Sequence, residues 1–180
     1  MPHIEIISSS IRLGRQSHRV ALFFRKFLEA KGLATASILD LKEYNFPLFD
    51  ERLSKQANAI PAAKDFADRV SKASAIIIVT PEYNGGYPAS LKNVVDLLYS
   101  EWRRKPIAIA AASDGPFGGT QVVTSLQFSL WKIGALTVPA RFHAANVGES
   151  YDEAGVPADK ALIEKMATGF VNEILRYVKT

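Results

Sequence analysis

The segment AIIIVTPEYNGGYPASLKNVVDLL, residues 75–98, joins two kinds of hydrophobic pattern. It opens within a strand expected at Ser74–Thr80, because the uninterrupted apolar run Ala75–Val79 is typical of a strand buried on both faces of a parallel sheet. It closes with apolar residues at the spacing i, i+3, i+4 and i+7, which predict a helix over Ser90–Ser100. Two prolines and two glycines lie between these patterns. The segment therefore predicts a strand, a tight loop and a helix.

The same alternation extends along the chain in both directions. Four more strands are expected, at His3–Ile7, Ala34–Leu39, Lys105–Ala112 and Leu136–Pro139. Four more helices are expected, at Ser17–Lys31, Ile60–Ala73, Thr120–Ile133 and Pro157–Lys179. The stretch Leu41–Lys55 is expected to be irregular, since Asn45 and Pro47 interrupt it. Strands alternating with helices predict one α/β domain over residues 1–180, with a five-stranded parallel sheet covered by helices on both faces.

Composition narrows the function classes. The 180 residues contain no cysteine, which removes disulfides, thiolate metal sites and cysteine nucleophiles, and the three histidines lack metal-ligand spacing, so no metal site is expected. The net charge of +4 is scattered along the chain and favours small anions, with no nucleic-acid partner expected. No apolar run is long enough to cross a membrane and no signal-peptide pattern is present, so a cytoplasmic location without membrane contact is expected.

In open parallel sheets, ligands bind beyond the carboxyl ends of the strands. The loops Ser8–Ser17, Pro81–Ser90 and Ser113–Gly119 follow three of the expected strands, and all three have unusual compositions. The first contains SSSIRLGRQSH, residues 8–18, in front of an expected helix. A helix N-terminus with serine hydroxyls and arginines is typical of a phosphomonoester site, although the segment matches neither the P-loop nor the GxGxxG pattern. The alternative is that the serines are turn and cap residues.

The second and third loops let backbone approach a ligand closely. Gly85–Gly86 permits positive φ, while Pro81 and Pro88 restrain the ends of the loop and Tyr83 offers an aromatic ring. The third loop, SDGPFGG at 113–119, is also rich in glycine. Together the three loops suit a flat heterocycle joined to a phosphate, which is the shape of FMN. The alternatives are a tightly packed connection for the second loop and a flexible surface loop for the third.

Four segments carry a resemblance to a known family. They are SSIRLGRQSHRVA at 9–21, FPLFDER at 46–52, TPEYNGGYPASLKNVVD at 80–96 and SDGPFGG at 113–119. With them, the sequence resembles the NADPH-dependent FMN reductase family, flavodoxin-like proteins that include quinone, azo-dye and chromate reductases. The third of these segments is the most specific match, and the resemblance runs over most of the chain.

The resemblance implies where the cofactor binds. The FMN phosphate would be held by residues of the first loop, namely Ser10, Arg12, Arg15, Gln16 and Ser17. The isoalloxazine ring would lie along the second loop and be approached by the third, at Pro81, Glu82, Tyr83, Asn84, Gly85, Ser113, Gly115 and Gly118. No catalytic side chain is expected, because FMN carries the hydride chemistry, with NADPH or NADH as the donor.

The function implied is an FMN-dependent NAD(P)H oxidoreductase that passes hydride to quinone-like or other small acceptors. Three alternatives stay open: a reductase of free FMN, a flavodoxin-type electron carrier without pyridine-nucleotide activity, and a binding or regulatory protein. Flavodoxin-type carriers are generally acidic, so the positive net charge of this chain counts against the electron-carrier alternative. The resemblance also suggests a homodimer or homotetramer whose interface includes Ser90–Leu98.

A few residues outside this scheme have two interpretations each. Glu82 is either structural or a catalytic acid. The basic residues 103–105 form either a solvated turn or a site for an NADPH phosphate, and His18 either lies near the phosphate or is an exposed helix residue. The stretch Ala144–Ala158 has no predicted place and is a candidate cover for a neighbouring subunit's site.

Overall fold

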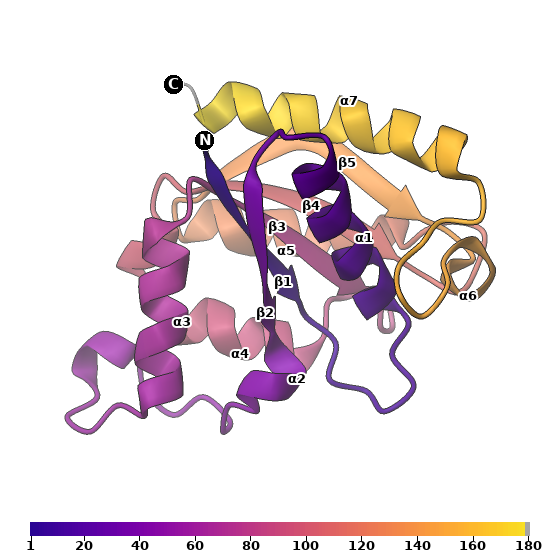
Figure 1. The fold of residues 1–180 in the computed structure, drawn as a ribbon. Helices are drawn as coiled ribbons and strands as arrows, with labels where there is room; N and C mark the ends of the chain where they lie inside the picture. Colours follow the sequence, from indigo (N-terminus) through magenta and orange to yellow (C-terminus); the bar gives the residue numbers. More distant parts are fainter. Residues whose placement is uncertain (179–180) are drawn as a thin grey trace.

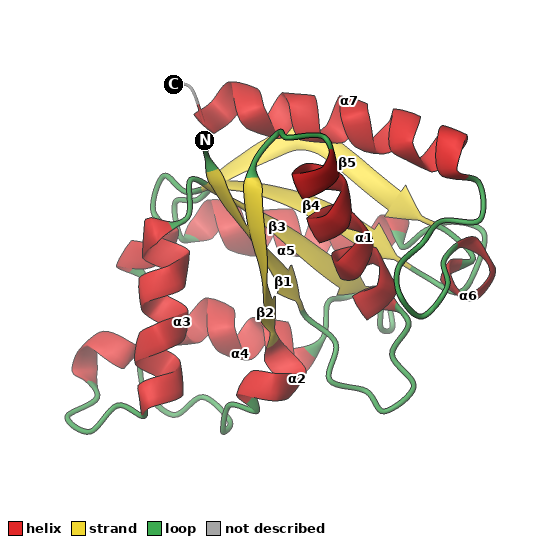
Figure 2. Ribbon diagram, in the orientation of Figure 1, coloured by secondary structure: helices red, strands yellow, loops and turns green. Residues whose placement is uncertain are grey.

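The computed structural model describes residues 1–178 as one parallel sheet between two layers of helices (Figure 1; Figure 2). The strands are paired in the order β2-β1-β3-β4-β5, and every pair is parallel. Their bounds are β1 His3–Ser8, β2 Thr35–Asp40, β3 Ala75–Pro81, β4 Pro106–Ala112 and β5 Leu136–Ala144. This is the flavodoxin-like strand order, so the expected fold class is confirmed.

Five long helices cover the sheet. Helices α1 (Ser17–Ala30) and α7 (Lys160–Val178) pack on one face, and α3 (Pro61–Lys72), α4 (Ala89–Leu97) and α5 (Thr120–Lys132) pack on the other (Figure 2). The shorter elements are α2 (Leu41–Tyr44), α6 (Val147–Ser150) and two 3₁₀ turns at Leu53–Lys55 and Ser100–Trp102. Within residues 1–178, none of the helices combines the length and the apolar character needed to cross a bilayer.

The central strands are buried on both faces. In β1, Ile6 belongs to the core on the α1 and α7 face of the sheet, while Ile7 belongs to the core on the opposite face. In β3, Ile77 and Ile78 divide between the two cores in the same way. All four side chains are 0% exposed. Burial of one such side chain stabilises a fold by about 1.5–3 kcal/mol, so this double packing holds the strands firmly. It therefore also sets where their carboxyl ends lie.

The prediction for the last strand was wrong about its length. We expected Leu136–Pro139, but β5 continues to Ala144. Pro139 lies in an edge strand, within a register shift that occurs between Ile107 and Ile109 of the neighbouring β4. Proline is tolerated at edges and bulges, where its missing N–H breaks no ladder hydrogen bond, so the strand continues past it.

Other predicted boundaries also differ from the structure, among them those of the helix expected at Ser90–Ser100, which spans Ala89–Leu97. The stretch expected to be irregular contains α2, which the Asp40 side chain caps by accepting a hydrogen bond from Lys42 N at 3.0 Å. The final helix begins at Lys160 instead of Pro157, because Pro157 pairs with Tyr151 in an isolated bridge. Its predicted last residue, Lys179, lies outside the described residues.

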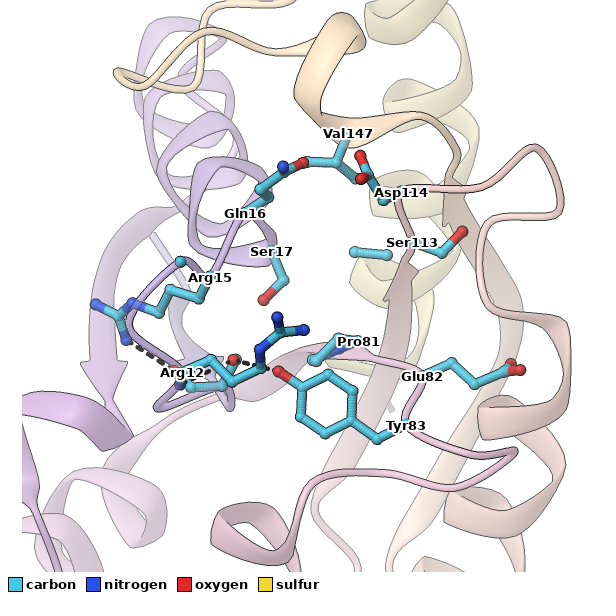
Figure 3. Close-up of a pocket in the computed structure, with 13 residues that line it drawn as sticks. Arg12, Arg15, Gln16, Ser17, Pro81, Glu82, Tyr83, Ser113, Asp114 and Val147 are labelled. Carbon is cyan, nitrogen blue, oxygen red and sulfur yellow. Dashed lines mark hydrogen bonds between the residues drawn. The ribbon is translucent and has the colours of Figure 1, made fainter.

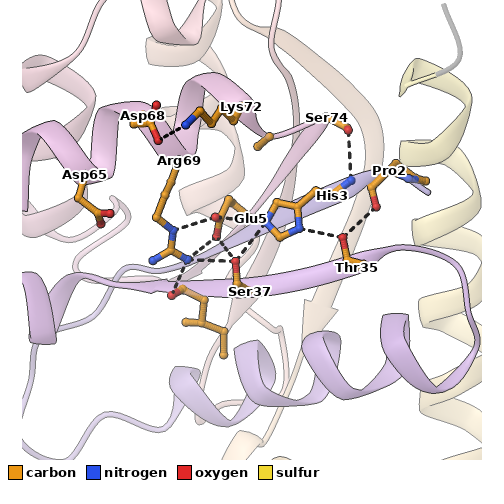
Figure 4. A network of polar contacts seen from close by, with 12 residues as sticks. Pro2, His3, Glu5, Thr35, Ser37, Asp65, Asp68, Arg69, Lys72 and Ser74 are labelled. Atoms are coloured by element: carbon orange, nitrogen blue, oxygen red, sulfur yellow. Dashed lines mark hydrogen bonds and ion pairs between the residues drawn. The ribbon is translucent and has the colours of Figure 1, made fainter.

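A buried carboxylate joins β1, β2 and α3. Glu5 of β1 is 2% exposed and accepts hydrogen bonds from Arg69 of α3, from Nε to Oε1 at 2.9 Å and from Nη2 to Oε2 at 2.8 Å (Figure 4). Ser37 of β2 donates to the same carboxylate at 2.9 Å. A bidentate arginine and a hydroxyl satisfy most of the acceptor sites of a carboxylate, so this charge is compensated inside the fold.

Glu5→Gln is expected to lower the free energy of unfolding by about 3 kcal/mol, because removing one member of a buried pair leaves the other charge uncompensated. Urea unfolding checks this, read as a lower midpoint at constant slope. The control is Lys72→Ala, which removes an exposed ion pair to Asp68 and is expected to cost no more than about 0.5 kcal/mol. Equal effects of the two variants would contradict the prediction.

Candidate functional site

A cleft opens at the carboxyl ends of β1, β3 and β4 (Figure 3). The pairing of β1 with both β2 and β3 makes this the point where the strand order reverses, which is where sheets of this kind bind ligands. The cleft is lined by Ser10, Arg12, Gly14, Arg15, Gln16, Ser17, Pro81, Glu82, Tyr83, Ala112, Ser113, Asp114 and Val147. All three loops expected from the sequence contribute to it, together with the start of α6.

The first loop presents unpaired polar atoms at the N-terminus of α1. Gln16 is the N-cap residue, and its side chain makes no capping hydrogen bond. Ser17 is 5% exposed and points into the cleft (Figure 3), and its Oγ and the Oε1 of Gln16 are buried without a hydrogen-bond partner among the described residues. Buried polar atoms are nearly always paired in folded proteins. This corner of the cleft is therefore suited to a polar ligand, and the helix dipole favours an anion.

The guanidinium of Arg15 turns away from the centre of the cleft (Figure 3). Its Nη1 and Nη2 donate to the two carboxylate oxygens of Asp40, the last residue of β2, and Nη1 also donates to the carbonyl of Ser10 at 2.9 Å. The Arg15 and Asp40 side chains are 12% and 3% exposed. Arg15 thus lines the cleft with a charge that is already neutralised.

The charges behind this loop interact closely. Burial by itself would raise the pKa of Asp40, but hydrogen bonds from Arg15 and from Lys42 N outweigh it and hold that pKa below its usual value. His18 lies beside the pair, with Nδ1 3.0 Å from Ser8 Oγ and 3.5 Å from Asp40 Oδ2. Burial lowers the pKa of His18, and the nearby Arg15 lowers it further. His18 belongs to this cluster behind the loop and does not line the cleft.

Arg12 supplies a free positive charge on the other side of the loop. It is exposed, and its guanidinium carbon lies 5.7 Å from the centre of the Tyr83 ring. The Tyr83 hydroxyl in turn lies 2.8 Å from Ser10 Oγ, which links the first loop to the second. No carboxylate of the described residues pairs with Arg12. Its charge is therefore available to a ligand in the cleft.

The second loop is a tight hairpin. Tyr83 N donates to Gly86 O at 2.8 Å, and Gly86 N donates to Tyr83 O at 3.0 Å. The two residues between them, Asn84 and Gly85, have φ values of 53° and 78°. Positive φ at both central residues defines a type I′ turn, for which Asn-Gly is the preferred sequence. The positive φ thus falls on Asn84 and Gly85 instead of on the two glycines.

Glu82 holds the second loop against α5. Its Oε2 accepts hydrogen bonds from Gln121 N at 2.8 Å and from Val122 N at 3.1 Å, in the first turn of that helix. A carboxylate at this position satisfies free N–H groups and complements the helix dipole. This geometry supports the structural interpretation of Glu82.

The third loop is fastened to the chain that follows β5. Ser113 N donates to Ala144 O at 2.9 Å, Val147 N donates to Ser113 O at 3.1 Å, and Asn146 N donates to Gly115 O at 3.1 Å. Gly118 has φ of 62°, and a Cβ there would lie 2.9 Å from the Cβ of His143. Any larger residue would therefore push the loop off the strand.

The structure brings together most of the residues expected at the site. Asn84, Gly85, Gly115 and Gly118 belong to the same loops but do not line the cleft. The residues expected from the sequence did not include Gly14, Ala112, Asp114 or Val147, all of which line the cleft. Gly14, Ala112 and Asp114 lie in or next to the expected loops, which was the only signal that the sequence offered for them. Val147 had no such signal, because it comes to the cleft only where the chain leaves the carboxyl end of β5.

The basic residues 103–105 do not reach the cleft. They directly precede β4, so they lie at the amino end of that strand, opposite the edge where the cleft opens. Lys105 Nζ donates to Ser71 O at 2.9 Å and also to Ala73 O, and burial lowers its pKa. These contacts support a structural role for Lys105 and remove the interpretation of this turn as a phosphate site beside the cleft.

Comparison with known proteins agrees with the geometry. An NAD(P)H-dependent FMN reductase of Saccharomyces cerevisiae is 31% identical over 137 residues, which are 69% of this chain and 71% of the relative. A quinone reductase of Pseudomonas putida is 33% identical over 124 residues, covering 64% of each chain.

Among solved structures, the flavoenzyme NAD(P)H:(acceptor) oxidoreductase FerB of Paracoccus denitrificans superposes with a TM-score of 0.79 at 23% identity, covering 99% of this chain and 98% of that one. That likeness concerns the fold. The sequence model of the NADPH-dependent FMN reductase family matches residues 2–149 of this chain, and these include every loop of the cleft. This chain therefore belongs to the NADPH-dependent FMN reductase family.

Proposed function

We propose that this chain holds FMN in the cleft and uses it to pass hydride from NADPH or NADH to quinone-like or other small acceptors. Family membership makes the chain an FMN-dependent NAD(P)H oxidoreductase. The observation that supports the placement of FMN is a pair of buried atoms at the start of α1, Ser17 Oγ and Gln16 Oε1, which have no hydrogen-bond partner among residues 1–178. The same loop carries Arg12, whose charge pairs with no carboxylate of those residues. The quinone reductase among the relatives supports the choice of acceptor.

The first loop fits the phosphate of FMN. A phosphomonoester carries up to two negative charges and accepts several hydrogen bonds. The loop offers the free N–H groups of α1, the hydroxyls of Ser10 and Ser17, the amide of Gln16 and the charge of Arg12. Hydrogen-bond donors and a positive charge suit an anionic ligand that accepts hydrogen bonds. In this proposal Arg15 contributes through the loop that it supports, because its charge is neutralised by Asp40.

The second and third loops fit a flat ring. Pro81, Glu82 and Tyr83 line one side of the cleft and Ser113 lines another, while Asn84 and Gly85 expose the tip of the hairpin. We place the isoalloxazine between these loops, with Gly115 and Gly118 shaping the third. Backbone groups near the edge of the ring suit a cofactor whose reduced form carries negative charge, since N–H donors stabilise such charge.

When bound, FMN supplies the chemistry, by accepting hydride from one substrate and giving it to the next. The residues of the chain bind and orient. Arg12 and the N-terminus of α1 offset the phosphate charge, and the Asn84–Gly85 hairpin and the third loop fix the place of the ring. No side chain needs to act as an acid, and Glu82 is already engaged by the first turn of α5.

The proposal extends to the organisation of the protein. We place the whole chain, residues 1–180, in one FMN-binding domain, working in the cytoplasm where NAD(P)H is available. We also propose a homodimer or homotetramer that uses α4 and the segment beside it. Leu48 and Phe49 are 86% and 37% exposed, and Asn93 of α4 holds this segment through Phe49 N at 2.6 Å and Pro47 O at 2.8 Å. Exposed apolar side chains next to a helix support an interface there.

The purified chain is expected to retain FMN after desalting, and anaerobic NADPH or NADH is expected to bleach the visible flavin absorbance. The reason is that the first loop anchors the phosphate while the ring stays accessible to the donor. Recording the spectrum before and after each nucleotide checks both steps. Retained flavin that neither nucleotide bleaches would indicate an electron carrier, and loss of flavin on desalting would indicate a free-flavin reductase or a binding protein.

Glu82→Ala is expected to lower the free energy of unfolding by about 1–2 kcal/mol, because two N–H groups of α5 lose their acceptor. Glu82→Gln keeps an acceptor atom and is expected to recover most of that loss. Because Glu82 is assigned no proton transfer, the pH profile of kcat should keep its shape in the Gln variant. Urea unfolding and steady-state kinetics measure the two effects. A stable Gln variant without turnover would show that Glu82 is a catalytic acid.

Leu48→Asp is expected to shift the protein toward the monomer, because a charge in an apolar interface costs several kcal/mol without a partner. Light scattering after size exclusion measures the mass. The matched control is Leu162→Asp on α7, a residue 54% exposed on the opposite face of the sheet, which should leave the mass unchanged. A monomeric wild-type chain, or equal effects of both variants, would contradict an interface at α4.

A further inference from the structure

We propose that Asp40 is a positioning residue for the phosphate loop, and that through Arg15 it sets the preference of this site for FMN over riboflavin. The inference rests on the proposed function, because it takes the first loop as the phosphate site. It goes further by giving a role to a residue outside the cleft, since Asp40 is not among the residues that line it. Asp40 therefore acts through other groups and not by contact with the ligand.

Asp40 is held rigidly. It is the last residue of β2, 4% exposed, and it pairs with Ser8 in the register between β2 and β1. One carboxylate oxygen also caps α2 through Lys42 N at 3.0 Å. The carboxylate thus has a fixed position relative to the sheet, and any group bound to it shares that position. The group bound to it is the guanidinium of Arg15, in a two-point contact that also fixes the direction of the side chain.

The same guanidinium closes the first loop. Arg15 Nη1 donates to the carbonyl of Ser10 at 2.9 Å, so one side chain joins the two ends of the turn to each other and to β2. Between these ends Leu13 is 95% exposed, whereas Ser10 is 0% exposed. The turn has little packing of its own, and the contact with Arg15 gives it a definite shape. Residues on both sides of the closure, Ser10 and Ser17, carry hydroxyls at the cleft.

The different charge environments of Arg15 and Arg12 distinguish a positioning role for Arg15 from direct binding of the phosphate. The Asp40 carboxylate neutralises Arg15, while Arg12 on the same loop has no such partner among residues 1–178. A phosphate in the cleft would be attracted by Arg12 and by the start of α1, and Arg15 would contribute only by keeping their geometry. Loss of the ion pair should therefore weaken the binding of the phosphate end of the ligand more than that of the ring. Riboflavin has the same ring and ribityl chain without the phosphate, so it reports on the ring alone.

The experiment measures the Kd of the full-length chain for FMN and for riboflavin, by quenching of flavin fluorescence, in the wild type and in Asp40→Asn. Asparagine is as good an N-cap as aspartate, so this variant keeps the cap of α2 and removes the charge that holds Arg15. The matched control is Glu5→Gln, which removes the charge of a second buried carboxylate with a bidentate arginine (Figure 4) and which is not among the residues that line the cleft.

We expect the ratio of Kd for riboflavin to Kd for FMN to fall by at least about tenfold in Asp40→Asn, because charge-assisted contacts to the phosphate are lost. In Glu5→Gln the ratio should stay within about twofold of the wild type, whatever the loss of stability. An equal loss of affinity for both flavins in Asp40→Asn would overturn the inference. Tighter FMN binding would also overturn it, because Arg15 would then bind the phosphate itself when released.

A second variant covers the case in which Asp40→Asn fails to fold. Arg15→Lys keeps a positive charge and loses the two-point contact, so the same fall in the ratio is expected. An unchanged ratio in this variant would show that charge is sufficient, and would overturn the positioning role. A wild-type chain that binds no FMN would refute the proposed function together with this inference. Wild-type FMN binding with unchanged ratios in both variants would refute the inference alone.

Discussion

The burial of both faces of β1, β3 and β4 is the constraint on which the rest of the structure depends. Because neighbouring strands are parallel, each connection runs from the carboxyl end of one strand back to the amino end of the next. The helices in these connections cover both faces of the sheet. Functional groups cannot point from the faces of such strands, because those faces are filled by Ile6, Ile7 and their neighbours. They gather instead where the strands end. The carboxyl edge beside the reversal of strand order is thus the place that the packing leaves open.

Each loop at that edge is fastened from outside. Ser90 at the start of α4 donates to the carbonyl of Ser9 at 2.6 Å, Glu82 accepts from the first turn of α5, and Asp40 holds Arg15. These contacts provide hydrogen-bond partners for the loop groups that face the rest of the protein. The polar atoms left over at the first loop include Ser17 Oγ, which faces the cleft. A site whose supports are complete before the ligand arrives loses little entropy on binding.

The different roles of the two arginines in the first loop follow from the same arrangement. Arg12 and Arg15 are three residues apart and look equivalent in the sequence, yet in the part of the chain that the structure describes only Arg15 meets a carboxylate. One of them therefore carries charge toward the ligand, and the other shapes the loop that presents it. For a family in which the cofactor supplies the chemistry, such placement is the main contribution that the protein makes.

The sequence by itself determined the fold class, the three loops at the carboxyl edge and their resemblance to FMN reductases, because these rest on local patterns. Apolar runs such as Ala75–Val79 and a turn dipeptide such as Asn84–Gly85 act over a few residues. Only the tertiary structure decided which partners those residues meet. Asp40 follows Arg15 by 25 residues, Glu82 reaches α5 across 39, and the extension of β5 past Pro139 depends on its place at the edge. The physical reason is that ion pairs and caps form through space, and packing of the whole sheet sets their geometry.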